Sequence, residues 1–141
     1  MKRYYLCIIL FVCGITKNAY TQELSKHRWN NRLVLLVVQD SSNQLLQRQL
    51  EEFEKHKKGL EERKILVYMI APNGFKKEDE SWNYSEALFK KYNQNKTPFE
   101  VILLGLDGGI KARKKEIFYC RDLFAIVDAM PMRQNEIRKQ H

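Results

Sequence analysis

The sequence is short of the residues on which most enzyme active sites depend. Its 141 residues include three cysteines, three histidines and six glycines, and no two cysteines stand in a C-x-x-C motif. It also lacks a glycine-rich phosphate loop, a metal-ligand spacing and a pair of carboxylates placed for acid–base catalysis. We therefore expect no cofactor and no metal site, and dithiol exchange through a C-x-x-C motif is excluded.

The one long apolar run lies at the N-terminus. Lys2 and Arg3 precede a mostly apolar stretch over residues 4–15, and a short polar region follows. This is the layout of a secretory signal peptide, and the run is too short for a comfortable membrane span. We predict a signal peptide over residues 1–21, cleaved near Thr21 or Gln22, and an exported protein, periplasmic or extracellular. The alternative is a retained amphiphilic anchor.

Cleavage would change two properties of the chain. It would remove three cations, so that the net charge of +8 falls by three to a modest +5. It would also remove Cys7 and Cys13, which leaves Cys120 as the one cysteine of a single domain over residues 22–141. An exported protein with one cysteine has no internal disulfide, so its stability must come from packing.

Two continuous apolar runs, Leu33–Val38 and Ile65–Ile70, predict strands buried on both faces of a mainly parallel sheet. Between them, Gln44–Arg63 has its apolar residues on one helical face, which predicts a helix. Ser42 or Asn43 can cap its start, and Gly59 is expected to end or break it near its C-terminus. Together these elements predict a right-handed βαβ unit.

Turn signals divide the rest of the chain into further elements. We predict a turn and charged loop at Ala71–Glu80, a helix at about Tyr84–Tyr92, a buried strand at Phe99–Leu104, a returning edge strand at Ile110–Ile117, and a helix at Cys120–Met130. The Asp107-Gly108-Gly109 run is a hairpin turn, and Pro131 is expected to close the last helix before a polar tail. Trp82-Asn83-Tyr84 is either an exposed aromatic patch or a hydrophobic staple.

The order of elements predicts an α/β fold with a thioredoxin-like arrangement. A βαβ unit is followed by a helix and a β-hairpin, which gives a central mixed sheet of about four strands flanked by helices. Thr97-Pro98 stands immediately before the third strand. Thioredoxin-like proteins usually hold a cis-proline at this place, beside the start of the first helix, and proline is the residue that makes a cis bond accessible. The alternative is a trans proline that opens the strand.

Three stretches narrow this resemblance: "RLVLLVVQDS", "FEVILLGLDGGIKAR" and "LFAIVDAMPMRQNEIR". They resemble the thioredoxin-like domain of unknown function found in bacterial exported proteins and in sushi-repeat-containing and coiled-coil-domain extracellular matrix proteins of animals. The resemblance covers about Leu24 to Arg138 and is most specific from Gly105 to Met132. It implies a compact extracytoplasmic domain, and it implies no catalytic residue.

The turn after the first strand reads Asp40-Ser41-Ser42-Asn43. In a redox-active thioredoxin this turn carries the C-x-x-C dithiol. A serine hydroxyl is not appreciably ionised at neutral pH, and no histidine is local to serve as its base, so the turn is a poor nucleophile. It either caps the following helix or, together with Thr97 and Pro98, forms a shallow binding groove.

Cys120 is the remaining redox candidate. It precedes Arg121 at the predicted start of the last helix, which we expect at the same sheet edge as the Asp40 turn and Pro98. A thiol at a helix N-terminus beside a cation can be acidified. The sequence leaves three roles open: a reactive thiol, a small core side chain, or a disulfide that links two copies.

These observations favour a non-catalytic binding or interaction module whose partner is a peptide, a protein or a small ligand. The alternative is a one-cysteine thiol reductase or peroxidase in which Arg121 stabilises the Cys120 thiolate, so the sequence leaves open whether the protein is an enzyme. Basic clusters at Lys55–Lys58 and Lys111–Lys115 would suit an acidic polymer. Glutamates interleave with the first cluster, which indicates a solvated helix, and we expect no nucleic-acid partner.

Overall fold

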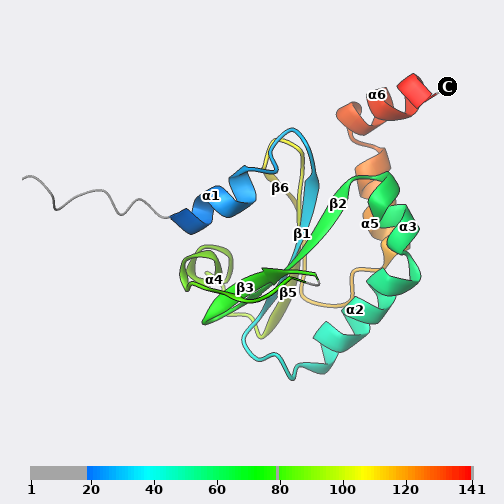
Figure 1. Cartoon of the computed structure of the whole chain (residues 1–141). Coiled ribbons are helices and arrows are strands. Elements are labelled where there is room, and N and C mark those ends of the chain that lie inside the picture. The colour runs from blue at the N-terminus through cyan, green and yellow to red at the C-terminus, as the bar shows by residue number, and fades with distance from the viewer. Residues whose placement is uncertain (1–18, 79, 141) are drawn as a thin grey trace, which may run out of the picture.

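The structure is a computed structural model that describes residues 19–78 and 80–140. A six-stranded mixed sheet lies at its centre, in the order β4-β3-β2-β1-β5-β6. The strands are β1 (Arg32–Val38), β2 (Ile65–Ala71), β3 (Gly74–Lys77), β4 (Asn83–Tyr84), β5 (Phe99–Leu104) and β6 (Ile110–Lys114). The helices are α1 (Ala19–Ser25), α2 (Gln44–Lys55), α3 (Lys57–Glu62), α4 (Ala87–Tyr92), α5 (Cys120–Asp128) and α6 (Pro131–Gln140) (Figure 1).

β1 is the central strand. It pairs in parallel with β2 and antiparallel with β5, and every one of its side chains is buried, as its continuous aliphatic sequence predicts. β5 pairs antiparallel with β6, which is mostly exposed at one edge of the sheet. The α/β class, the parallel pair joined by a helical connection and the closing hairpin are confirmed.

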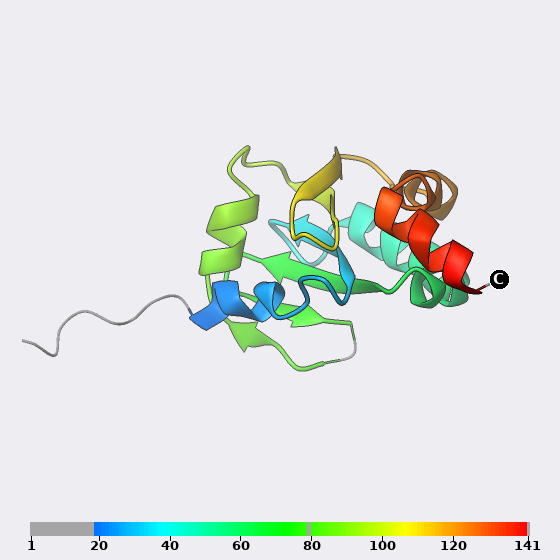
Figure 2. The same ribbon diagram turned by 90° about the horizontal axis from the view of Figure 1, so that it is seen from above.

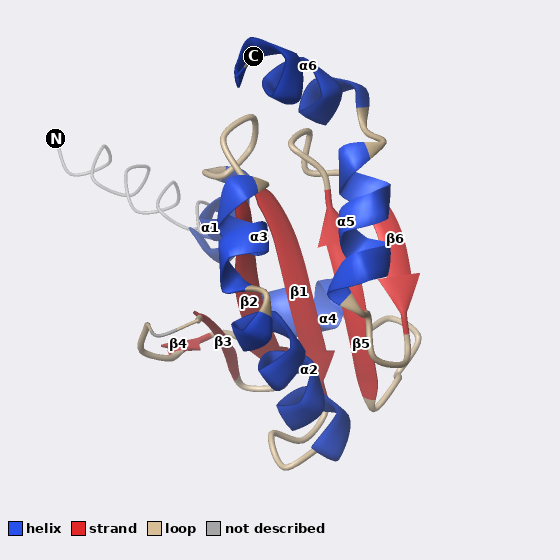
Figure 3. Cartoon of the chain, turned by 90° about the vertical axis from the view of Figure 1, so that its right-hand side faces the viewer, coloured by secondary structure: helices blue, strands red, loops and turns tan. Residues whose placement is uncertain are grey.

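Helices cover both faces of the sheet, so the domain has three layers. α2, α3 and α5 lie on one face, and α1 and α4 lie on the other (Figures 2 and 3). Alternate residues of β1 divide between the two cores, because successive side chains of a strand point to opposite faces. Val34, Leu36 and Val38 belong to the first core, and Leu33, Leu35 and Val37 to the second.

The predicted helix at Gln44–Arg63 is divided into α2 and α3 at His56. The backbone of His56 leaves the helical range there (φ −116°, ψ 21°). Its ring Nδ1 lies 2.9 Å from the carbonyl oxygen of Glu52, while its own N–H bonds to the carbonyls of Phe53 and Glu54. A side chain that takes the place of the backbone donor in this way interrupts a helix. The break therefore lies at His56, three residues before the glycine expected to cause it.

Gly59 serves close packing instead. A Cβ built at this position would meet Cε2 of Phe124 at 2.6 Å and Cζ at 2.8 Å. The Phe124 ring is also held by the guanidinium of Arg63, 4.2 Å from its centroid. Only a residue without a side chain lets α3 approach α5 this closely.

We expect Gly59→Ala to destabilise the protein by about 1–3 kcal/mol, because overpacking outweighs the gain in helix propensity of about 1 kcal/mol. Urea unfolding measures this change. Adding Phe124→Leu removes the clash. The double variant should therefore lose less stability than the two single variants lose in sum, by at least about 0.5 kcal/mol. Additive losses would contradict the packing role of Gly59.

The strand count of about four was too low, because the segment predicted as a turn and charged loop contains β3, and β4 follows it. The Pro72-Asn73 turn joins β2 to β3, and Phe75 is the one buried side chain of β3. A Cβ on Gly74 would meet the carbonyl oxygen of Asn83 at 2.5 Å, so this glycine lets the two short strands pair. One buried apolar residue is too weak a pattern to predict a strand. The predicted start of the next helix, Tyr84, lies in β4, and α4 begins at Ala87.

The polar tail, for which no element was predicted, forms α6. Pro131 opens α6 rather than ending the chain's regular structure, because a proline at the first helical position lacks an N–H that would have no partner there anyway. Arg133 fixes α6 to the domain: its side chain is only 2% exposed and ion-pairs with Glu62 at 2.7 Å and with Asp128 at 3.3 Å. Ionic contacts leave no apolar periodicity in the sequence, so the pattern gave no sign of this helix.

Three further predictions concern the backbone and the N-terminus. The described residues contain no cis peptide bond, so Pro98 is trans and the cis form that the resemblance implied is not present. Within the same residues, no helix is both long and apolar enough to span a membrane. The predicted signal peptide over residues 1–21 lies almost wholly outside the described residues and stays a prediction.

Candidate functional site

The turn after β1 is an exposed cap for α2. Oδ1 of Asn43 accepts a hydrogen bond from the N–H of Leu45 at 2.9 Å, and Oδ1 of Asp40 accepts one from the N–H of Ser42 at 2.9 Å. Hydrogen bonds from Ser42 hold the pKa of Asp40 below its ordinary value. Ser41 and Ser42 are exposed. The turn therefore presents a charged carboxylate and two hydroxyls to solvent at the end of the central strand.

Asp40 and Ser41 line a groove of about 390 Å³ at the carboxyl ends of β1 and β2. The Pro72-Asn73 turn and the side chains of Trp82 and Tyr84 form its other wall. Tyr84 is 81% exposed, whereas Trp82 is partly buried against the core. In α/β sheets, ligands bind preferentially at the carboxyl ends of parallel strands. The groove combines polar groups with aromatic surface, which is the composition of a recognition site.

Thr97 and Pro98 lie beside this turn but outside the groove. The N–H of Gln39 donates to the carbonyl oxygen of Pro98 at 3.1 Å, so Pro98 and the Asp40 turn share one sheet edge as expected. Pro98 is exposed. Thr97 is buried, and both its N–H and its hydroxyl bond to Oδ1 of Asn93. The geometry thus brings together Asp40 and Ser41, while Thr97 is occupied within its own loop.

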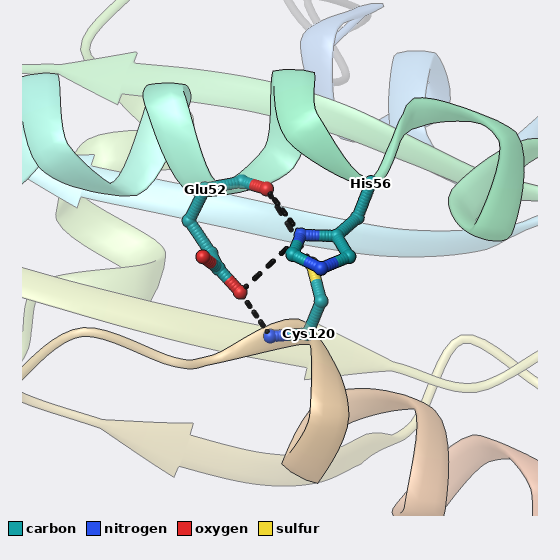
Figure 4. Close-up of side chains that lie close together, drawn as sticks. All are labelled: Glu52, His56 and Cys120. Atoms are coloured by element: carbon teal, nitrogen blue, oxygen red, sulfur yellow. Dashed lines mark hydrogen bonds and ion pairs between the residues drawn. The ribbon is translucent and has the colours of Figure 1, made fainter.

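Cys120 is fully buried at the start of α5, against α2 (Figure 4). Its N–H donates to Oε1 of Glu52 at 2.8 Å, and its Sγ lies 3.9 Å from the carbonyl oxygen of Glu52. Burial, followed by the negative charge of Glu52, raises the pKa of Cys120 to about 12. A thiol with this pKa is protonated at neutral pH, and the thiolate is the nucleophilic form.

The start of α5 does not lie at the sheet edge where we expected it. Cys120 contacts Glu52, which is about two and a half turns along α2 from Asn43. Arg121 is turned to solvent: its side chain is 87% exposed and pairs with Asp122 at 3.1 Å. Residues 115–119 connect β6 to α5. The sequence pattern does not define the path of this connection, so it did not place the start of α5. The thiol and the Asp40 groove are therefore separate.

Within the described part of the chain, the donor atoms of Glu52, His56 and Cys120 lie within 4.8 Å of one another, close enough to hold a metal ion (Figure 4). Carboxylate, imidazole and thiolate are all zinc ligands, although three donors are one short of the four in a structural zinc site. The hydrogen bonds give Glu52 a structural role instead. The Glu52 carboxylate binds the free N–H at the start of α5, where Tyr119 makes no side-chain cap.

The sequence did not assign Pro72 or Asn73 to a site. Trp82-Asn83-Tyr84 was noted as either an exposed patch or a buried staple, and the structure divides the two roles, with Tyr84 exposed and Trp82 partly buried. The available signal was the aromatic pair close after a Pro-Asn-Gly turn. Its place next to Asp40 depends on the β2–β3 pairing, which was not predicted.

The fold and the groove define a mixed α/β domain with an exposed polar turn where β1 ends and no accessible thiol in the described residues. Residues 23–136 match the family model described as a domain of unknown function, DUF4174. The chain belongs to this family, because the match spans most of its length. No curated protein and no solved structure shows significant similarity to the chain.

Proposed function

We propose that the protein is an exported binding module of thioredoxin-like architecture that has no dithiol, and that its recognition site is the groove at Asp40, Ser41, Pro72 and Tyr84. The observation that carries this proposal is the exposed, cysteine-free turn between β1 and α2, which opens to a groove with an exposed aromatic ring. Such a site offers recognition without a nucleophile.

The topology supports the thioredoxin-like part of the proposal. The parallel pair β1 and β2 is joined through α2 and α3, and the antiparallel pair β5 and β6 leads to α5. The β3–β4 hairpin is added at the β2 edge, and it supplies Tyr84 to the groove. The partner we expect is a peptide segment, because a proline, an exposed tyrosine and a carboxylate together suit mixed apolar and hydrogen-bonded contacts.

His56 lies close to Cys120, but the burial and the raised pKa of the thiol argue against the one-cysteine reductase or peroxidase. The sulfur is buried, its pKa is raised, and Arg121 pairs with Asp122. A disulfide to a second copy would likewise require the sulfur to reach the surface. The thiol instead supports packing of α5 on α2.

Peptides selected from a random displayed library on the immobilised protein test the proposed groove. We expect Tyr84→Ala to weaken their binding at least about tenfold, measured by fluorescence anisotropy, because exposed aromatic residues at the centre of an interface contribute most of its energy. Tyr119→Ala is the matched control, since Tyr119 is also exposed (49%) and lies outside the groove.

The control should change the affinity by less than about twofold. Equal losses in the two tyrosine variants, or peptides that bind Tyr84→Ala as tightly as the unchanged protein, would contradict the proposed groove.

A further inference from the structure

A second hollow, of about 470 Å³, lies at the opposite end of β1 from the Asp40 groove. It is formed by the segment before β1, the β5–β6 turn and the junction of α5 with α6. Arg32, the first residue of β1, lies in its lining, and Lys111 of β6 also contributes. The two hollows share no lining residue, so this one is independent of the proposed peptide groove.

Large apolar side chains gather around this hollow. Of the six exposed large hydrophobic residues in the described part of the chain, three line it: Trp29, Ile126 and Met132, which are 62%, 37% and 45% exposed. Met130 and Pro131 add further apolar surface. Exposed apolar residues are unremarkable singly, but their concentration in one concave surface marks a binding site.

The backbone at Trp29 adds an independent observation. Its φ is 67°, in the left-handed region that a bulky residue rarely adopts. The conformation is fixed by a hydrogen bond from the N–H of Trp29 to the carbonyl oxygen of Leu106 at 2.7 Å. Strained backbone of this kind persists where surrounding contacts hold it, and it is common at ligand sites. Here it holds an indole ring at the rim of the hollow.

The buried guanidinium of Arg32 has incomplete partners. Its side chain is 1% exposed, and its Nε has no hydrogen-bond partner within the described residues. Its Nη1 donates to the carbonyl oxygen of Arg63 at 2.9 Å, and its carboxylate partner is Glu136, at 3.3 Å, which is shared with Arg133. The neighbouring arginines have closer carboxylate partners: Arg63 pairs with Asp128 at 2.6 Å, and Arg133 with Glu62 at 2.7 Å.

A buried donor on a positive group calls for an acceptor, and an anionic acceptor forms the stronger bond. A ligand that fits both the buried cation and the apolar side chains of the hollow has a carboxylate and an apolar chain. We propose that this hollow binds a small carboxylate with an aliphatic chain, of the fatty-acid kind, with the carboxylate at Arg32 and the chain against Trp29, Ile126 and Met132. Lys111 and Asp107 both line the hollow and pair with each other at 2.8 Å, so their charges compensate and Arg32 is the group that attracts the carboxylate.

Fluorescence of Trp29 tests the proposal directly. The full-length protein with Trp82→Phe has Trp29 as its one tryptophan. Decanoate, titrated below its micelle concentration, should shift the Trp29 emission to shorter wavelength and saturate. Decanol and decyltrimethylammonium are the comparison probes. Decanoate should bind at least about tenfold more tightly than either, which is the effect of one charge-assisted hydrogen bond to a buried donor.

Two isoleucines provide matched variants. Ile126→Asp places a carboxylate inside the hollow and should abolish decanoate binding. Ile110→Asp, at a residue that is 48% exposed but outside the hollow, should leave it unchanged. Glu136→Gln removes the anion that competes for Arg32, so it should tighten decanoate binding several-fold, a gain that a merely structural role would not give.

Three outcomes would overturn the proposal. The first is an emission change that does not saturate, or equal affinity for decanoate and decanol. The second is an equal loss in Ile126→Asp and Ile110→Asp. The third is a dimer that sediments as such without ligand and dissociates in Ile126→Asp, because the occupant would then be a second copy. Tyr84→Ala should leave decanoate binding unchanged, which separates this test from that of the peptide groove.

Discussion

Cys120 in the folded protein should react with iodoacetamide at pH 8 at least about 100-fold more slowly than in the guanidinium-unfolded chain. The raised pKa alone, about 12 instead of the ordinary 9.0, lowers the thiolate fraction by roughly a thousandfold at this pH, and burial slows access further. Cys7→Ser and Cys13→Ser make Cys120 the one reactive group, and mass spectrometry follows the alkylated fraction over time.

Glu52 provides the matched comparison. Glu52→Gln keeps an oxygen that can accept from the Cys120 N–H but removes the negative charge that raises the thiol's pKa, so alkylation should become several-fold faster. Glu51→Gln, on the exposed side of the same helix, should have no effect. A native thiol that reacts at pH 6 faster than the unfolded one would contradict the buried-thiol description and favour the one-cysteine enzyme.

The raised pKa of Cys120 also makes the stability of the folded protein depend on pH. Folding raises the pKa of Cys120, so the protonated thiol favours the folded state. This contribution is complete below the ordinary thiol pKa near 9 and is lost as the pH rises towards 12. As the pH rises above the ordinary thiol pKa, the free energy of unfolding of the unchanged protein should therefore fall more steeply than that of Cys120→Ala.

Arg133→Leu should lower the free energy of unfolding by about 3 kcal/mol, the lower part of the range of roughly 3–5 kcal/mol expected when one member of a buried ion pair is removed. The lower part applies because the partners are not fully desolvated: Glu62 is 57% and Asp128 33% exposed. Urea unfolding followed by circular dichroism measures the change.

Arg138→Leu is the control on the same helix. Arg138 is exposed and bonds to Gln134 and Asn135 of α6 itself, so its replacement should change stability by no more than about 0.5 kcal/mol. A loss of equal size in both variants, or no loss in Arg133→Leu, would show that α6 is not held by the ionic contacts of Arg133.

The sequence predicted those elements whose packing leaves a periodic trace. The largely apolar runs of β1, β2 and β5 have strand length and are bounded by turn signals, which favours strands covered on both faces. β3 and β4 could not be predicted, because one buried phenylalanine, Phe75, and one glycine that allows close approach, Gly74, make no periodic pattern. α6 left none because its attachment depends on Arg133 and not on an apolar stripe.

The candidate sites divide in the same way. Asp40 and Ser41 could be selected from the sequence because a strand feeding a helix through small polar residues exposes them. Tyr84 joined them only through the pairing of β2 with β3 and of β3 with β4. Cys120 could also be selected from the sequence as a candidate, but its contact with Glu52 comes from packing of α5 on α2. In the sequence Arg32 is simply a polar residue at the start of a strand. Only the structure shows that its guanidinium is buried and that its Nε lacks a partner within the described residues.

By itself the sequence determined the α/β class, the central buried strand and the lack of a dithiol, because hydrophobic period and residue chemistry are local properties. The tertiary structure decided which side chains meet: the groove at Asp40, the acidic neighbour of Cys120 and the hollow at Arg32. The physical reason is that burial and charge compensation arise between segments far apart in the chain, and no window of sequence contains both partners.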